Sequence, residues 1–156
     1  MIILAALLLG ILTGARTFMA LALVSGYALV IAPQPLIPAF GWLSEWWAFV
    51  PLAALAGLEL WGDKQPRTPS RTETGGVLAR LIAAAVAGAA LGGLLPAVAG
   101  ILGAAAGTYG CAFLRAWLAA RLDSDFRAAL AEDALAICGS LAVLVWLVLG
   151  PPPSRG

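Results

Sequence analysis

The chain has 156 residues with a formal net charge of +1, and 62% of its residues are hydrophobic while only 11% are charged. Soluble domains are about 45–50% apolar and about 25% charged, so this composition excludes a soluble globular domain and predicts an integral membrane protein. The balance of charges argues against nucleic acid as a partner, because a phosphate-binding face needs clustered excess base.

The first apolar segment runs from Ile2 to about Ala32. A bilayer core about 30 Å thick is crossed by about 20 residues of helix, so this segment is too long for one upright span. Glycines at positions 10, 14 and 26 are places where a helix can break or bend, and Pro33 begins the proline-rich stretch that ends it. We therefore expect a first span, and the sequence leaves open whether it is continuous or split.

The following segments give the rest of the architecture. The stretch 40–47 (FGWLSEWW) holds three tryptophans and one acid, which is typical of a segment at the headgroup level. A second span follows to about Gly62, and the next three cover about residues 77–95, 97–120 and 126–149. We predict one all-α transmembrane domain over residues 1–150, a helical bundle of about five spans, and a short Pro-rich tail over 151–156.

Basic residues give the expected orientation. They gather between the second and third spans, at Lys64, Arg67, Arg71 and Arg80, and again near Arg121 between the last two spans. Both turns are therefore expected in the cytoplasm, which places the N-terminus inside and the C-terminus outside. Spans 1–2 and 4–5 then run in opposite directions, which predicts an inverted repeat of the kind found in transporters.

Pairs of glycines four residues apart indicate close helix packing. Gly10 with Gly14, and Gly103 with Gly107, each place two small residues on one helix face, where the backbone of a neighbouring helix can approach. Packing within the chain is the plainest interpretation. Because so much of the surface is small and smooth, we also expect a homo-oligomer, surrounded by membrane lipids.

Charges inside the spans are the candidates for function, since a charge near the membrane centre costs about 2.5–3.5 kcal/mol even on a mild scale. Arg16 lies well inside the first span and needs a carboxylate, backbone carbonyls or water. Glu59 is the preferred partner because sequence-adjacent spans usually pack together, and Glu132 and Asp133 are the other candidates. As the alternative, these two acids favour a helix N-terminus, and Arg115 only reaches toward headgroups.

The stretch 59–73 (ELWGDKQPRTPSRTE) is predicted to form a structured cytoplasmic turn, because Pro66 and Pro69 prevent a helix from continuing through it. Glu59 and Asp63 share a helix face at its start. The bases Lys64, Arg67 and Arg71 are expected either to hold these acids at a cytoplasmic mouth or to bind anionic lipid headgroups.

These residues also carry a resemblance. GARTF (14–18), together with ELWGDKQP (59–66) and PSRTETG (69–75), resembles a family of small bacterial membrane proteins known as domain-of-unknown-function family 4126. The resemblance covers most of the chain and implies a multi-span inner-membrane protein without an assigned activity. The residues that match its motifs are Arg16, Glu59, Asp63, Lys64, Pro66 and Arg71.

An enzyme is not expected. The chain has no histidine, which removes the commonest general base and metal ligand, and it lacks phosphate-loop and Gly-x-Ser-x-Gly motifs. We expect no cofactor and no metal, and a transporter or channel for an unidentified ion or small solute. Two alternatives stay open: a membrane scaffold or assembly protein, and, less favoured, a magnesium-dependent lipid-phosphate enzyme built on Glu59 and Asp63.

Overall fold

The computed structural model describes residues 1–30, 37–62 and 74–149, and every regular element in these residues is a helix. The all-α prediction is therefore confirmed for this part of the chain. The elements are α1 (Ile2–Ala15), α2 (Thr17–Val30), the 3-10 helix η1 (Pro38–Ser44), α3 (Trp46–Gly62), α4 (Thr74–Gly92), α5 (Leu94–Leu122) and α6 (Asp125–Leu149).

Three of the described helices, α4, α5 and α6, are long and apolar enough to cross a membrane. The pair of η1 and α3, which bends by 67°, would make a fourth span. The predicted first span is instead two apolar helices of 14 residues each, α1 and α2. By length and composition the described residues thus offer three or four spans where about five are expected, and the first predicted span is split in the structure.

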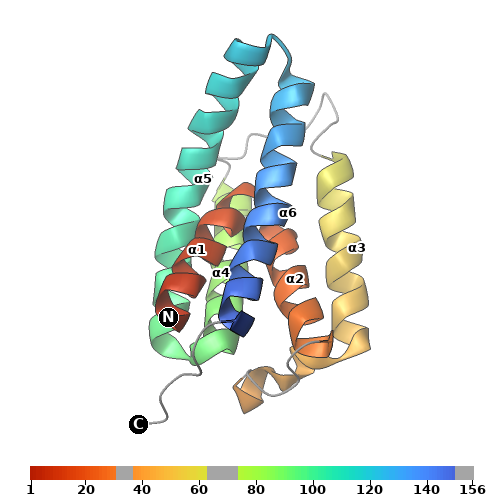
Figure 1. Ribbon diagram of the computed structural model, residues 1–156, viewed down its shortest axis with the longest axis vertical. Coiled ribbons are helices and arrows are strands. Elements are labelled where there is room, and N and C mark those ends of the chain that lie inside the picture. The colour runs from red at the N-terminus through yellow and green to blue at the C-terminus, as the bar shows by residue number, and fades with distance from the viewer. Residues whose placement is uncertain (31–36, 63–73, 150–156) are drawn as a thin grey trace.

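The split reverses the direction of the chain. In Figure 1, α1 rises from the N-terminus, α2 runs back down, and α3 to α6 alternate in direction after it. The start of α1 and the end of α6 consequently lie at one end of the bundle, and the α5–α6 turn lies at the other. This arrangement contradicts the expectation that the N-terminus lies on the same side as that turn. It also removes the basis of the predicted inverted repeat, which needed a first span running in a single direction.

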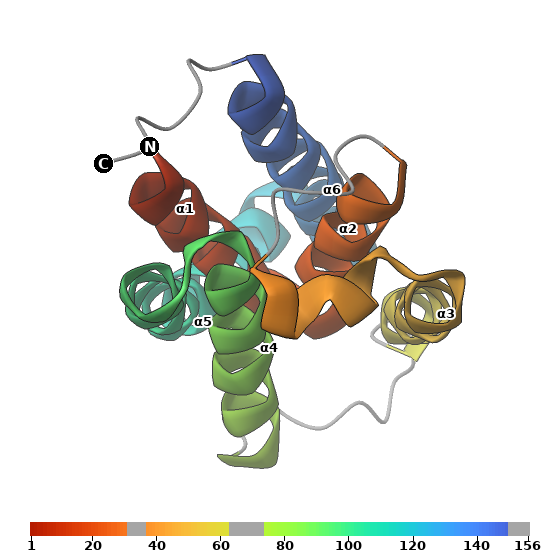
Figure 2. The same ribbon diagram turned by 90° about the horizontal axis from the view of Figure 1, so that it is seen from below.

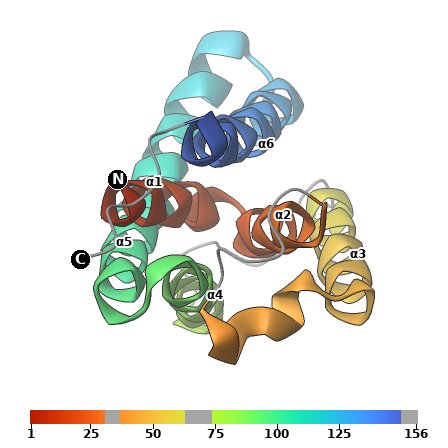
Figure 3. The ribbon, with the colours of Figure 1, turned by 60° about the horizontal axis from the view of Figure 1, so that its bottom comes forward.

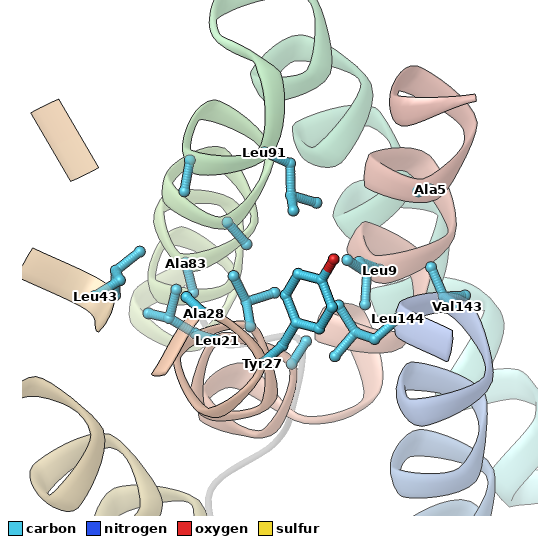
Figure 4. Close-up of a cluster of buried hydrophobic side chains, with 14 residues drawn as sticks. Ala5, Leu9, Leu21, Tyr27, Ala28, Leu43, Ala83, Leu91, Val143 and Leu144 are labelled. Atoms are coloured by element: carbon cyan, nitrogen blue, oxygen red, sulfur yellow. The ribbon is translucent and has the colours of Figure 1, made fainter. Parts of the chain in front are cut away.

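The hairpin formed by α1 and α2 is packed on several sides. α1 lies against α4, α5 and α6, and α2 lies against α3, α4, α6 and η1, as the views from below show (Figures 2 and 3). The main apolar core joins α1, α2, α4 and α6 and includes Leu9, Leu21, Val24, Leu91 and Leu144 (Figure 4).

Glycines make the contact between α1 and α5 unusually close. A Cβ atom on Gly10 would overlap the backbone of Gly100, and one on Gly14 would overlap the backbone of Gly107 and Thr108. From the α5 side, a Cβ on Gly103 or Gly107 would overlap carbonyl oxygens of α1. These glycine pairs therefore serve packing within one chain, and the homo-oligomer stays a prediction that they no longer motivate.

Candidate functional site

Arg16 stands at the break between α1 and α2. Its backbone is extended, with φ −141° and ψ 109°, and its N–H closes α1 by donating to the Leu12 carbonyl at 3.1 Å. The residue is 1% exposed, and its side chain is the largest fully buried one among the described residues. A guanidinium stays charged in proteins, so burial on this scale requires polar partners nearby.

A partner of Arg16 comes from α6. Arg16 Nη2 donates to Asp133 Oδ1 in a buried ion pair that joins positions 117 residues apart in the sequence. The described ion pair of Arg16 is therefore with Asp133, one of the other candidate acids, and not with Glu59, which the sequence favours. The physical reason is the reversal at Arg16, because α6 packs against both arms of the hairpin.

Glu59, on α3, has a different role. Its two carboxylate oxygens accept hydrogen bonds from the backbone N–H groups of Thr17, at 2.6 Å, and Phe18, at 2.9 Å. These N–H groups open α2 and have no partner within the helix, and a carboxylate at a helix N-terminus also complements the helix dipole. Arg16 follows the C-terminus of α1, where its positive charge complements the negative end of the α1 dipole.

A second set of charges links α5 to α6. Arg115 binds Asp125 through two hydrogen bonds, Nε to Oδ1 at 3.1 Å and Nη2 to Oδ2 at 2.9 Å, and its Nη1 lies 3.7 Å from Glu132 Oε2. Glu132 is 2% exposed and Asp133 is 6% exposed, so neither is a solvated acid at a helix start. Successive residues on a helix point about 100° apart, since one turn takes about 3.6 residues, and so these neighbours meet bases on different elements. The structure thus favours a buried cluster over interface anchoring for both acids.

Arg80 is a charged residue whose position the sequence interpretation missed. It was counted only among the bases of the turn before it, but it lies in the second turn of α4 and is 7% exposed. The signal that could have revealed it is the apolar run on its C-terminal side, which continues for three turns.

The other predicted residues lie outside this cluster or outside the described part of the chain. Asp63, Lys64, Arg67 and Arg71 belong to the segment 63–73, which the structure does not describe. Gly10, Gly14, Gly103 and Gly107 lie at the α1–α5 contact next to the cluster. Among residues 1–30, 37–62 and 74–149, no three histidine, cysteine or acidic side chains are grouped so that they could hold a metal ion.

Comparison of the chain with protein families, with curated proteins and with solved structures gives no match. The resemblance to domain-of-unknown-function family 4126 therefore stays a prediction, and the function has to be argued from the site itself.

Proposed function

We propose that this protein is a small transporter or channel of the inner membrane that moves an ion or small solute past the tip of the α1–α2 hairpin. The observation that supports this most is the buried Arg16–Asp133 pair at a helix break. Broken helices inside a membrane leave backbone groups unpaired, and they are tolerated where they are buried in protein or line a path for a solute.

The depth of the pair supports the same proposal. Gly14 packs on Gly107 and Thr108, so Arg16 lies level with about residue 110 of α5. The helical rise of about 1.5 Å per residue then places Arg16 about 24 Å from the start of α5, whose full length of about 43 Å matches a bilayer with its headgroups. An upright α5 would hold the pair inside the hydrocarbon region, beyond easy reach of either headgroup layer.

A purely structural role explains such a pair poorly. Burying two charges costs several kcal/mol for each ion, and replacing a buried pair by apolar residues of similar volume is often neutral or stabilising by about 1–4 kcal/mol. Ionisable groups inside a membrane more often mark ion or proton pathways. This reasoning favours transport over the scaffold alternative.

The proposal is tested by flux into liposomes. We expect purified wild-type protein to carry at least one of a panel of small ions and solutes, and Asp133→Asn to lower that flux at least tenfold while eluting as the wild type does. Glu45→Gln, which changes an exposed acid beside η1, is the control and should carry the wild-type flux. Wild-type liposomes that behave as empty ones for the whole panel would favour the scaffold alternative instead.

We further propose that the end of the bundle with the α5–α6 turn faces the cytoplasm, because Arg121 and Arg127 flank this turn. Both termini then lie outside, which reverses the cytoplasmic N-terminus expected from a single first span. Reporter tags fused to the N-terminus and to the C-terminus should both report the outer side, and a tag inserted at Asp123 should report the cytoplasm. An N-terminal tag that reports the same side as Asp123 would contradict this topology.

Membrane lipids are the proposed surroundings of the outer helix faces. Large apolar side chains are exposed along α3 and around the α5–α6 hairpin, and tryptophans occur near both ends of α3, where aromatic belts meet headgroups. The exposed set on α3 includes Trp46, Trp47, Val50, Leu55, Leu58 and Trp61.

A further inference from the structure

Two hydroxyl groups between the hairpin and α6, on Ser140 and Tyr27, have no hydrogen bond to any described residue, and that of Ser140 is fully buried. Ser140 of α6 is 0% exposed and its Oγ has no partner, and Tyr27 of α2 is 8% exposed with no hydrogen bond to its hydroxyl in the described part of the chain. Three other buried hydroxyls are satisfied: Thr13 and Thr108 each donate to the carbonyl four residues earlier at 2.8 Å, and Ser25 donates to Leu43 O at 2.6 Å. Ser44 Oγ also lacks a partner, but it lies at the end of η1 and not on α2 or α6.

These two hydroxyls lie at successive depths below the ion pair. Ser140 belongs to the same buried face of α6 as Asp133, and seven residues of helix place it about 10 Å from that residue toward the end of α6. Tyr27 comes from the neighbouring α2, and its ring lies beside Leu144, one turn below Ser140 (Figure 4). Its hydroxyl points from α2 toward Leu9 of α1.

A buried hydroxyl without a partner costs about 1–3 kcal/mol, and proteins usually meet this cost with an ordered water or a bound ligand. Serine in an apolar helix can instead bond the carbonyl four residues earlier, as Thr13 and Thr108 do here, but Ser140 does not. The buried Ser140 Oγ, with the unbonded Tyr27 hydroxyl on the adjoining α2, therefore points to a polar occupant between the end of α6 and Asp133.

We propose that Tyr27 and Ser140 mark the outer half of a proton route that ends on Asp133. This inference rests on the proposed transport function and names its substrate as the proton, carried between the hydroxyls by water. A hydroxyl can accept one proton and donate another, and a carboxylate can take up the proton at the end of the route. A bare cation such as Ca²⁺ would need about 6–8 oxygen ligands, which two hydroxyls do not supply.

Arrival of the proton has a consequence for the hairpin. The proton binds a carboxylate oxygen of Asp133, which loses its charge, while Arg16 keeps its own. The attraction between the hairpin tip and α6 then weakens. The buried or half-buried charges on helices around the hairpin include Glu59 on α3, Arg80 on α4, Arg115 on α5 and Glu132 on α6, so the tip remains in a charged environment that can accept Arg16.

The test measures proton flux in liposomes that contain a pH-sensitive dye, driven by a potassium diffusion potential. We expect Ser140→Ala and Tyr27→Phe each to lower the wild-type proton flux at least fivefold, and Ser140→Thr, which keeps the hydroxyl, to stay within twofold. Thr108→Val is the matched control, because it removes a buried hydroxyl that is already bonded within its own helix. All variants are compared at equal incorporation and with wild-type elution.

The outcomes separate this inference from the proposed function. Ser140→Ala and Tyr27→Phe with the same flux as Thr108→Val would overturn the route. A wild-type protein that carries another ion or solute but no protons would also overturn it, while leaving transport in place. A wild-type protein that carries nothing would overturn both.

Discussion

Arg16→Ala is expected to lower the free energy of unfolding by about 3–5 kcal/mol, because it removes the guanidinium that meets the Asp133 carboxylate inside the bundle. Asp133→Ala should cost a similar amount by leaving the guanidinium without this carboxylate. The double variant removes both charges and should be more stable than the sum of the two single losses predicts. Thermal and denaturant unfolding in mild detergent measure the three variants against wild type.

Two controls make this cycle specific. Glu45→Ala changes an exposed acid and should stay within about 0.5 kcal/mol of wild type. Combining Arg16→Ala with Glu59→Ala should give losses nearer to additive, since Glu59 binds backbone N–H groups of α2 and the described ion pair of Arg16 goes to Asp133. Strictly additive losses for Arg16 and Asp133 would contradict a direct pair.

Gly107→Leu is expected to prevent α1 from packing on α5, and Gly107→Ala to cost about 1–3 kcal/mol, because even a Cβ at this position would overlap the backbone of Ile11. Gly110→Ala offers a control three residues away on the same helix, where a Cβ would meet nothing within 4 Å. That change should be neutral or stabilising by up to about 1 kcal/mol, since alanine favours a helix over glycine. Melting temperature and elution profile report both effects.

The glycine prediction fails if Gly107→Ala and Gly110→Ala melt at the same temperature. Such a result would mean that α1 and α5 can separate without loss, and the tip of the hairpin would then need another support. Gly14→Leu tests the same contact from the α1 side and should follow Gly107→Leu.

The sequence predicts which segments form apolar helices, but it predicts poorly in which direction these helices run and which of them pack together. Hydropathy located the apolar helices, and the cost of a buried charge singled out Arg16. Hydropathy carries no direction, however, and one extended residue was enough to turn a single predicted span into two opposed helices. The predicted orientation and the predicted inverted repeat both depend on that span running in one direction, so both lose this support.

The partner of Arg16 shows the same limit. Adjacency along the chain favoured Glu59, while Asp133 lay 117 residues away, and energetics alone allowed either acid. Only tertiary packing distinguishes them, because α6 reaches the tip of the hairpin and Glu59 binds the backbone N–H groups at the start of α2.

The hydroxyls of Ser140 and Tyr27 could not be singled out from the sequence, since a serine or tyrosine in an apolar helix usually finds a hydrogen-bond partner.

The pairing of α1 with α5 and of Arg16 with Asp133 also sets an order for biogenesis. Ribosomes release the N-terminal hairpin long before α5 and α6 exist, so during that interval the glycine face of α1 has no helix to receive it and Arg16 lacks its α6 carboxylate. The nascent chain must hold this charge near an interface or within the insertion machinery until its last helix arrives.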